Sequence, residues 1–401
     1  MAAGNLQTHL VGGIDPHADT IHVAVVTEVG KPLADAEFRT DPDGYRAAVA
    51  FLTTSGEIER VGVEGAAGYG AGITRALVAA GLEVVEVERP TRSDRRRAGK
   101  TDQLDAYHAA RSVLAGRTSP IKGTQVDALR ALNLARRSAV KARTAAGNQL
   151  KAVLVMAPDD VRSRYRGLNT DRLVDALRRV RPDLVSDPTS TAVLTALKSL
   201  ARRHRDLTEE ITTLTGHLDT LVTTARPALR EAYGVGPDVA AQLLITAGNN
   251  PERLSSEASF AALCGVAPVP ASSGKTHRHR LSRGGDRQAN AALHRIVLNR
   301  GQHHAPTKAY VARQTERGRT PREIRRMLKR AVAREVYRLL VRDCPVAVFD
   351  DLRPARQAKN ITLRDAARQL GTWPSVLSNL ERGLRRDHDL TAHYRDWLHA
   401  A

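Results

Sequence analysis

The sequence predicts an α/β domain near the N-terminus and a mostly helical chain after it. Residues 9–87 alternate short runs rich in valine and isoleucine with segments of helical period, in the order β-β-β-α-β-α-β, and another helix follows residue 101. From residue 125 onward, apolar residues recur every three or four positions, as in a helix. We therefore expect an α/β domain over 9–120 and helices beyond it.

The α/β region opens with a predicted β-hairpin over residues 9–27, in which a short polar turn separates two apolar runs. Asp15 lies at the end of the first strand of this hairpin, and Glu64 ends a later short strand. The remaining strands are expected at 32–40, 60–64 and 82–87, and helices at 43–55 and 73–80.

Two further acids, Asp102 and Asp105, stand three residues apart after a basic run. We expect Thr101 to cap the helix that follows, so both carboxylates face the same way in its first turn. The four acids thus fall at strand ends or at a helix start. This pattern is typical of an RNase H-like fold, where carboxylates hold two metal ions that stabilise the attacking and leaving oxygens of a phosphoryl transfer.

The charge of the chain points to a polyanionic partner. The net charge is +19, which favours nucleic acid over an acidic small molecule or an inert basic enzyme. Residues 1–91 carry 6 Lys and Arg against 13 Asp and Glu, whereas residues 275–334 carry 17 against 3. An acidic module that can hold cations is therefore joined to a basic module that can bind nucleic acid.

The cysteine content and hydropathy indicate the compartment. Cys264 and Cys344 can form neither a disulfide framework nor a zinc site by themselves, which fits a reducing cytoplasm. No apolar run approaches the roughly 20 residues of a membrane span, and no export signal is visible. We expect a cytoplasmic protein with no membrane partner.

Residues 125–226 contain two stretches of helical period separated by the segment 158–190. They predict an antiparallel helical arm, an element that commonly serves as a spacer or in dimerisation. Several basic residues fall on its expected outer face, where solvation is a better interpretation than contact with nucleic acid. They are Arg136, Arg137, Lys141, Arg143 and Lys151.

Residues 227–345 hold three features that suit contact with a phosphate backbone. Gly234-Val-Gly236-Pro precedes a helix, as in a helix-hairpin-helix, where backbone N–H groups at a helix start bind phosphate. Ser272 and Ser273 lie on an expected loop; loop serines are usually structural, but nearby cations could offset charge on a phosphate under attack. These cations are Lys275, Arg278, Arg280 and Arg283. An amphipathic helix with an Arg/Lys face is expected at 321–342.

The sequence of the tail, residues 356–401, predicts a small separate domain. Residues 360–383 read as helix, turn at Gly371 and a second helix opened by Pro374. This arrangement indicates a helix-turn-helix, in which Ser375 and Asn379 would face DNA bases. The alternative is a helical hairpin used for assembly.

Several motifs together resemble the DEDD transposases of the insertion-sequence IS110 type. They are Gly13-Ile-Asp15, Val63-Glu64-Gly65, Lys100-Thr-Asp-Gln-Leu-Asp-Ala106, and Ser273-Gly274 followed by Leu281-Ser-Arg-Gly-Gly. The resemblance covers roughly residues 9–345, and the tail is similar instead to the helix-turn-helix of Cro-like repressors. The resemblance to the transposases implies a RuvC-like domain over 9–120, a helical arm over 125–226 and a transposase domain over 227–345.

Carried onto this sequence, the resemblance implies that Asp15, Glu64, Asp102 and Asp105 bind Mg²⁺ or Mn²⁺. Ser273 would be the nucleophile that becomes transiently linked to DNA, with Ser272 directly before it as the alternative. The resemblance further implies an active site shared between subunits of a homo-oligomer, a dimer to a tetramer. The implied partners are DNA at the element ends and target, and a structured non-coding guide RNA. A bacterial, nucleoid-associated location follows.

Three functions compete on these observations. The first is a recombinase that cuts and rejoins DNA through Ser273 and the four acids. The second is a metal-dependent, structure-specific nuclease of resolvase type, which would use the acids and water and leave free DNA ends. The third is a non-catalytic DNA-binding regulator built around residues 360–383, for which Asp102 would be dispensable.

Overall fold

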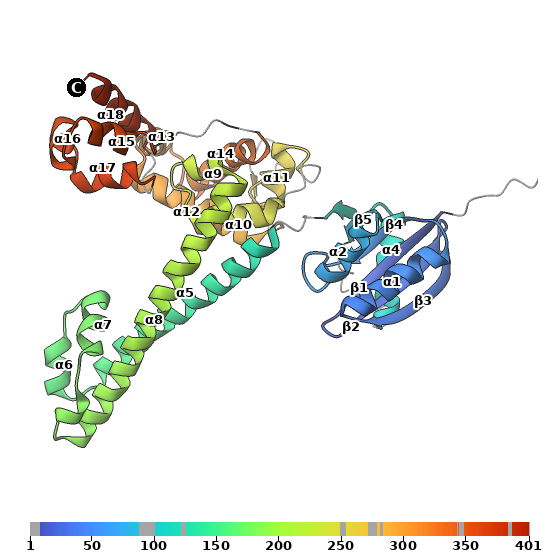
Figure 1. Ribbon diagram of the computed structural model, residues 1–401, viewed down its shortest axis with the longest axis horizontal. Coiled ribbons are helices and arrows are strands. Elements are labelled where there is room, and N and C mark those ends of the chain that lie inside the picture. Colours follow the sequence, from blue (N-terminus) through green and yellow to red (C-terminus); the bar gives the residue numbers. More distant parts are fainter. Residues whose placement is uncertain are drawn as a thin grey trace, which may run out of the picture. The chain divides into compact units, whose positions relative to one another are not determined.

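The computed structural model describes nine segments of the chain: 9–87, 101–121, 126–248, 254–271, 279–280, 284–342, 344, 349–383 and 387–400. The chain divides into two compact units, one formed by Met1–Ala131 with Leu243–Phe260 and the other by Leu132–Gln242 with Ala261–Ala401. The first unit contains a mixed sheet, and the second is mostly helical (Figure 1).

The first unit is built on a six-stranded sheet in the order β3-β2-β1-β4-β5-β6. The β1–β2, β2–β3 and β5–β6 pairs are antiparallel, whereas β1–β4 and β4–β5 are parallel. This mixed order is compatible with an RNase H-like domain. The strands are β1 Leu10–Pro16, β2 Thr20–Thr27, β3 Pro32–Arg39, β4 Ile58–Glu64, β5 Val84–Val87 and β6 Thr118–Pro120.

The strands expected from the alternation of apolar residues are confirmed, including the hairpin of β1 and β2. The sequence does not predict β6, because three residues are too few to carry an alternation pattern.

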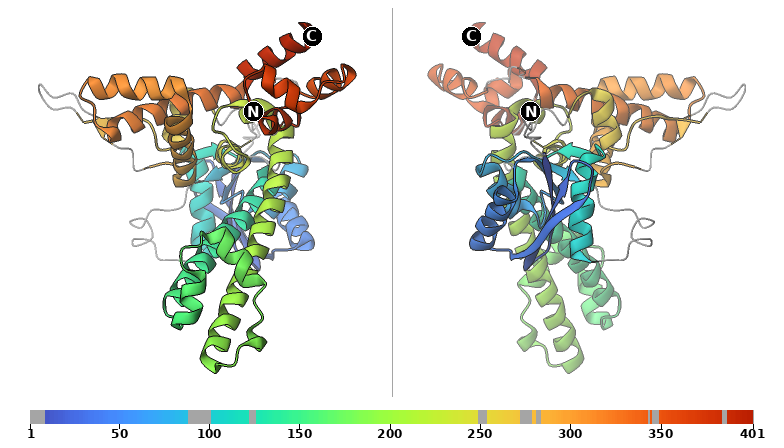
Figure 2. Two further views of the ribbon diagram at one scale, coloured as in Figure 1. Left: turned by 90° about the vertical axis from the view of Figure 1, so that its left-hand side faces the viewer. Right: turned by 90° about the vertical axis from the view of Figure 1, so that its right-hand side faces the viewer.

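Helices cover both faces of this sheet (Figure 2). On one face, α1 (Pro42–Ser55) and α2 (Ala71–Ala79) pack against apolar side chains such as Ile14 and Val63. On the other face, α4 (Asp102–Leu114) packs against Val11 and the neighbouring strands. Successive strand residues point to opposite faces, so Asp15 shares the α4 face with Val11 and Gly13.

Helix α4 approaches the sheet closely because two glycines lie beneath it. Gly13 on β1 and Gly62 on β4 are register partners. A Cβ atom on Gly13 would overlap the carbonyl oxygen of Ala106 and the amide nitrogen of Ala110, and one on Gly62 would lie 2.6 Å from Val113 Cγ2. Side chains at these positions would push the helix, and the acids at its start, away from the sheet.

The second unit contains the two long helices that the sequence predicts, α5 (Val126–Val155) and α8 (Pro188–Ala225). They run alongside each other (Figures 1 and 2), and Arg136 on α5 donates to Thr215 Oγ1 on α8 at 2.7 Å. The segment between them folds as α6 (Asp159–Tyr165), α7 (Thr170–Arg178) and the 3₁₀ turn η1 (Pro182–Leu184), which close an apolar core at the end of the arm.

One expectation for the arm is wrong. Arg136 was expected on the solvated face, but it is half-buried and its guanidinium also pairs with Asp238 at 3.4 Å. Conversely, the apolar residue Leu134 on the same helix is 68% exposed. Helical period predicts which residues share a face, but it does not fix how far a neighbouring helix extends over that face.

The helices after the arm pack around α12 and α14, whose contact is extensive. Helix α14 begins with a capping box between Thr320 and Glu323 and buries Ile324, Val332 and Val336, which confirms the amphipathic helix expected at 321–342. The elements here are α9 Pro227–Glu231, α10 Pro237–Ala247, α11 Glu257–Leu263, β7 Val269–Pro270, β8 His279–Arg280, α12 Arg287–His303, α13 Ala305–Glu316 and α14 Pro321–Val341.

The tail forms four short helices around their own core: α15 Leu352–Ala358, α16 Leu363–Gln369, α17 Pro374–Glu381 and α18 His388–Ala400. Gly371, at a φ of 61°, makes the turn between α16 and α17, and Pro374 opens α17 as expected. In the core, Arg356 donates two hydrogen bonds to Glu381, which also accepts one from Tyr394. None of the described helices is long and apolar enough to cross a membrane.

The glycine contact beneath α4 predicts a large effect of one added methyl group. Gly13→Ala should destabilise the N-terminal unit by about 2–3 kcal/mol, because the Cβ would meet helix backbone that cannot move aside cheaply. Gly68→Ala is the matched control, since its nearest atom would lie at an ordinary 3.4 Å. Calorimetry should show a lower unfolding temperature for Gly13→Ala only; equal transitions for both variants would contradict the packing described.

Candidate functional site

Asp15 lies near the end of β1, on the face that α4 covers, and only 5% of the residue is exposed. Its Oδ2 atom is buried and has no hydrogen-bond partner among the described residues. A buried carboxylate oxygen without a hydrogen-bond partner is costly to keep charged. Such an atom therefore suits a site that receives a cation.

The other three acids lie at the start of helix α4 and at the end of strand β4. Thr101 Oγ1 accepts a hydrogen bond from Leu104 N at 3.2 Å, which confirms Thr101 as the N-cap and places Asp102 and Asp105 in the first turn of α4. Glu64 ends β4, the parallel neighbour of β1, and Gly65 follows it with a φ of 64°, a conformation that favours glycine. The chain thus turns away directly after the carboxylate.

The charges of the other three acids act on Asp15. Burial raises the pKa of Asp15, His17 opposes this shift, and the charges of Glu64, Asp105 and Asp102 raise the pKa further. Asp15 and Asp102 lie in one cluster, and Glu64 and Asp105 influence Asp15 through their charges. Like charges held this close repel one another, so a cation among them would stabilise the site.

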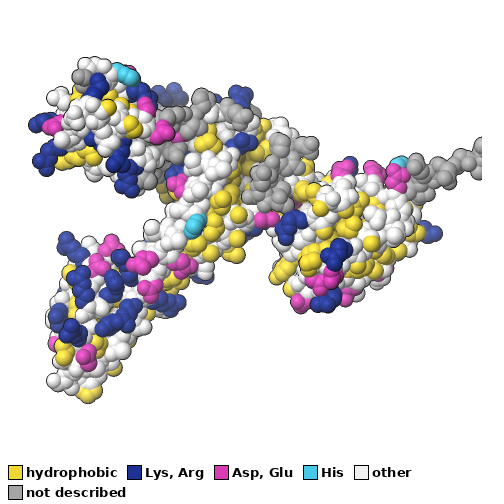
Figure 3. All heavy atoms as spheres, viewed as in Figure 1, with side chains coloured by type: hydrophobic (Ala, Val, Ile, Leu, Met, Phe, Trp, Pro, Cys, Tyr) yellow, Lys and Arg dark blue, Asp and Glu magenta, His cyan; other side chains and the backbone are white. Residues whose placement is uncertain are grey.

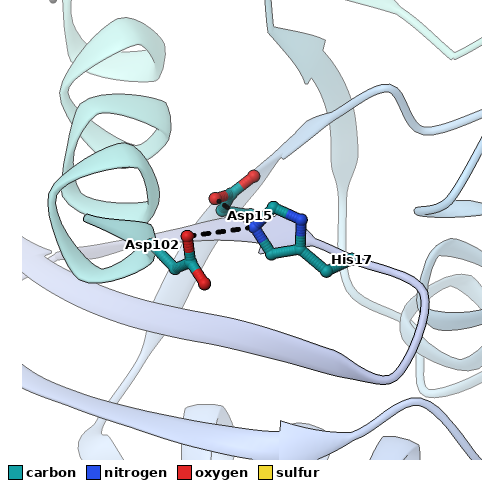
Figure 4. Close-up of side chains that lie close together, drawn as sticks. All are labelled: Asp15, His17 and Asp102. Carbon is teal, nitrogen blue, oxygen red and sulfur yellow. Dashed lines mark ion pairs between the residues drawn. The ribbon is translucent and has the colours of Figure 1, made fainter. Parts of the chain in front are cut away.

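His17 completes the cluster, and sequence reasoning missed it. Its Nε2 atom lies 3.2 Å from Asp15 Oδ2 and 3.1 Å from Asp102 Oδ1. Figure 4 shows the three side chains pointing toward one another from the β1 hairpin and the start of α4. The available signal was its position, two residues after a strand-end acid in a tight hairpin.

The cluster fits a divalent metal ion. One ligand atom each from Asp15, His17 and Asp102 lie within 4.8 Å of one another, close enough to share a single ion. Carboxylate oxygens are the preferred ligands of Mg²⁺ and Mn²⁺, and Asp15 Oδ2, which has no hydrogen bond among the described residues, is available for one.

A hydrogen-bond network around Asp35 on β3 fixes the start of α4. Asp35 Oδ1 accepts from Gln103 Nε2 at 2.9 Å and from Tyr107 OH at 2.8 Å, and Oδ2 lies 2.9 Å from His22 Nε2. Partial burial would raise the pKa of Asp35, but the hydrogen bonds from Gln103, His22 and Tyr107 outweigh it and leave the pKa below its usual value. Burial and Asp35 together raise the pKa of Tyr107 to about 12.

The predicted serine and most of its neighbouring cations lie outside the described residues: Ser272, Ser273, Lys275, Arg278 and Arg283. Arg280 is described and is exposed on β8.

The chain on either side of this segment is closely packed. Asn290 Nδ2 donates to the carbonyls of Cys264 and Gly265, and Lys329 Nζ donates to Asn290 Oδ1 at 2.9 Å. A Cβ on Gly285 would lie 2.6 Å from Ala262 O, so the backbone at Gly285 lies directly against the backbone at Ala262.

The other expected nucleic-acid contacts are at the surface of the second unit. Gly234, at a φ of 76°, and Gly236 line a hollow of about 490 Å³ before α10. The N–H of Val235, which lies between the two glycines, donates a hydrogen bond to Ala232 O within the turn. This N–H group is therefore not free to bind a phosphate. Ser375 and Asn379 are exposed on α17.

The charge cluster predicts that removing one acid stabilises the chain in the absence of metal. Because burial and the neighbouring acids raise the folded-state pKa of Asp15, its charge costs stability increasingly as pH rises above the unfolded pKa of 3.8 and through the folded pKa. In EDTA, Asp15→Asn should unfold at a temperature about 2–4 °C higher than the parent chain. The exposed Glu59→Gln should show no such gain, and a less stable Asp15→Asn would contradict the repulsion.

The Asp35 network predicts a loss with the opposite pH dependence. Asp35→Asn should lower stability at pH 7 by about 1 kcal/mol, since the carboxylate is partly exposed. With a depressed folded pKa, this contribution is present above pH 3.8 and is lost as pH falls through the folded value. Urea unfolding at several pH values measures it. A stability difference between Asp35→Asn and the parent chain that grows as pH falls would contradict the network.

Comparisons with known proteins identify the family. A family model described as Transposase, for DEDD transposases of IS110 type, matches residues 12–157, which include all four acids. A second model, described as Transposase IS116/IS110/IS902 family, matches residues 226–312. No curated protein matches the chain. Together the two matched segments cover more than half of the sequence, and the chain belongs to the IS110-type DEDD transposases, which are DNA transposases.

Proposed function

We propose that this transposase moves an insertion sequence by cutting and rejoining DNA with an acidic metal site and a serine nucleophile. Asp15, Glu64, Asp102 and Asp105 would hold Mg²⁺ or Mn²⁺, and Ser273 would attack the DNA backbone. The observation that carries the proposal is the cluster of Asp15, His17 and Asp102, in which a buried Asp15 oxygen has no hydrogen bond among the described residues. Family membership implies DNA binding and suggests a divalent metal, which agrees with this cluster.

The chemistry divides between the two sets of residues. A bound divalent ion would supply a Lewis acid that stabilises charge on the phosphate oxygens. In the proposed step, Ser273 Oγ loses its proton and forms an ester with the phosphorus, while the bond from phosphorus to a DNA oxygen breaks and that oxygen takes up a proton to leave as a hydroxyl. A hydroxyl of the new partner strand then displaces the serine, so the number of phosphate esters is conserved and no hydrolysis is needed.

Several described surfaces support the proposed contact with DNA. Helix α14 exposes five arginines, and Arg342 is exposed directly after it: Arg322, Arg325, Arg326, Arg334, Arg338 and Arg342. Arginine rows of this kind suit a phosphate backbone. We propose that Arg280 and the turn at Gly234 and Gly236 contribute backbone contacts, with Lys275, Arg278 and Arg283 beside the serine.

We also propose that the tail is a DNA-binding helix-turn-helix. Ser375 and Asn379 are exposed on α17, which follows the turn at Gly371, as a recognition helix would. The domains would then be 9–120 for the RuvC-like domain, 125–226 for the arm, 227–345 for the transposase domain and 356–401 for the tail.

A guide RNA and an oligomeric assembly complete the proposal. Figure 3 shows Lys and Arg side chains gathered at the end of the arm. Helices α6 and α7, which form this end, expose Arg162, Arg164, Arg172 and Arg178. This basic surface suits an RNA backbone. Dimers or tetramers would allow the serine of one chain to work with the acids of another.

Replacing the serine tests the nucleophile. Ser273→Ala should abolish excision and joining while binding of DNA persists, because only the attacking oxygen is removed. Ser272→Ala is the matched control and should retain strand exchange. The measurement is a protease-digested covalent peptide–DNA adduct, which should map to Ser273.

Two results would overturn the serine proposal. Normal excision by Ser273→Ala would exclude this serine as the nucleophile. Free DNA ends without any adduct, unaffected by changes at Ser272 and Ser273, would instead indicate a metal-dependent nuclease that uses water.

A further inference from the structure

We propose that His17 is a direct ligand of the divalent metal, so that the site is a mixed nitrogen and oxygen site with a preference for transition metals. This inference rests on the proposed metal role of the acids, and it adds a residue outside the four of the DEDD set. It also assigns a chemical class to the ion: one that accepts imidazole, such as Mn²⁺ or Co²⁺, more readily than Mg²⁺ does.

The distances in the cluster are those of neighbouring ligands on one ion. Two ligand atoms that are each about 2.1 Å from a metal, at right angles to one another, lie about 3.0 Å apart. His17 Nε2 lies 3.2 Å from Asp15 Oδ2 and 3.1 Å from Asp102 Oδ1. The imidazole nitrogen is therefore spaced from both carboxylates as a third ligand would be.

These contacts do not have the geometry of ordinary hydrogen bonds. Asp15 Oδ2 and His17 Nε2 are both buried, and neither has a hydrogen-bond partner among the described residues. The side chain of Asp15 is more than nine-tenths buried and faces the imidazole nitrogen. Buried polar atoms without hydrogen bonds are rare in folded proteins, and here two of them face each other. A shared ion would satisfy both.

The backbone of His17 is held before any ion binds. Its N–H donates to Thr20 O at 2.8 Å across the hairpin turn, and its carbonyl accepts from Thr40 Oγ1 at 3.3 Å. The preceding Pro16 restricts the backbone further by fixing its own φ. A ligand on such a fixed turn loses little conformational entropy on metal binding, as expected for a residue of the site rather than a mobile surface histidine.

Ligand chemistry then predicts the selectivity. Mg²⁺ prefers oxygen ligands throughout, whereas imidazole nitrogen suits transition metals. In His17→Ala, we expect Mn²⁺ and Co²⁺ binding to weaken by about tenfold or more, and Mg²⁺ binding to change by about threefold or less. His108→Ala is the matched control, because His108 lies on α4 near the acids but outside the cluster.

Pulsed electron paramagnetic resonance of Mn²⁺ bound to the full-length chain tests the nitrogen ligand directly. The spectrum should show coupling to histidine nitrogen, and the coupling should change when the protein is made with 15N-labelled histidine. It should disappear in His17→Ala and persist in His108→Ala. The labelling result needs no mutation, so it holds even if His17→Ala fails to fold.

The outcomes separate this inference from the proposed function. If Mn²⁺ binding is lost in Asp15→Ala and Asp102→Ala but the parent shows no nitrogen coupling, His17 only bridges the carboxylates in the metal-free chain and the inference is wrong. If Mn²⁺ binding is unchanged in those two variants, the acidic metal site itself is wrong. Nitrogen coupling that survives in His17→Ala would assign the ligand to another histidine and would also overturn the inference.

Discussion

The close approach of helix α4 to strand β1 is the constraint on which the candidate site depends. Gly13 has no side chain, so the backbone of α4 lies directly against the strand at Ala106 and Ala110. Asp15 follows two residues along the same face of β1, and Asp102 begins the helix. A wider separation would leave the two carboxylates on the same side of the sheet but too far apart to share an ion.

The acids of the site repel one another, and contacts elsewhere in the unit must offset this repulsion. Burial and three neighbouring acids disfavour the charged form of Asp15, whereas His17 favours it. The apolar contacts of α4 with the sheet and the hydrogen bonds to Asp35 hold the helix start in place despite this repulsion. Metal affinity and stability are therefore opposed in this unit, as is common where function requires like charges close together.

Local patterns in the sequence predict the strands, the long helices and the cap of α4, because each depends on neighbouring residues. Thr101 is recognisable as an N-cap from its own side chain, and the hairpin of β1 and β2 from its alternation. The positions of the four acids at strand ends and at a helix start were also predictable from these patterns. Their catalytic roles, and that of Ser273, stay predictions.

What the sequence does not reveal depends on contacts between distant segments. The position of His17 against Asp102 is set by the packing of α4 on β1, and the network of Asp35 joins β3 to the same helix. The half-buried pairing of Arg136 with Asp238 likewise requires the fold of the second unit. No short-range pattern marks such residues, because a lone histidine, aspartate or arginine is usually solvated.

Diffraction from crystals soaked in Mn²⁺, recorded at a wavelength where manganese scatters anomalously, tests the central claim most directly. The account predicts an anomalous peak between the carboxylates of Asp15 and Asp102, at the end of β1 and the start of α4. A well-ordered site with no peak there, or a peak only elsewhere on the chain, would contradict it.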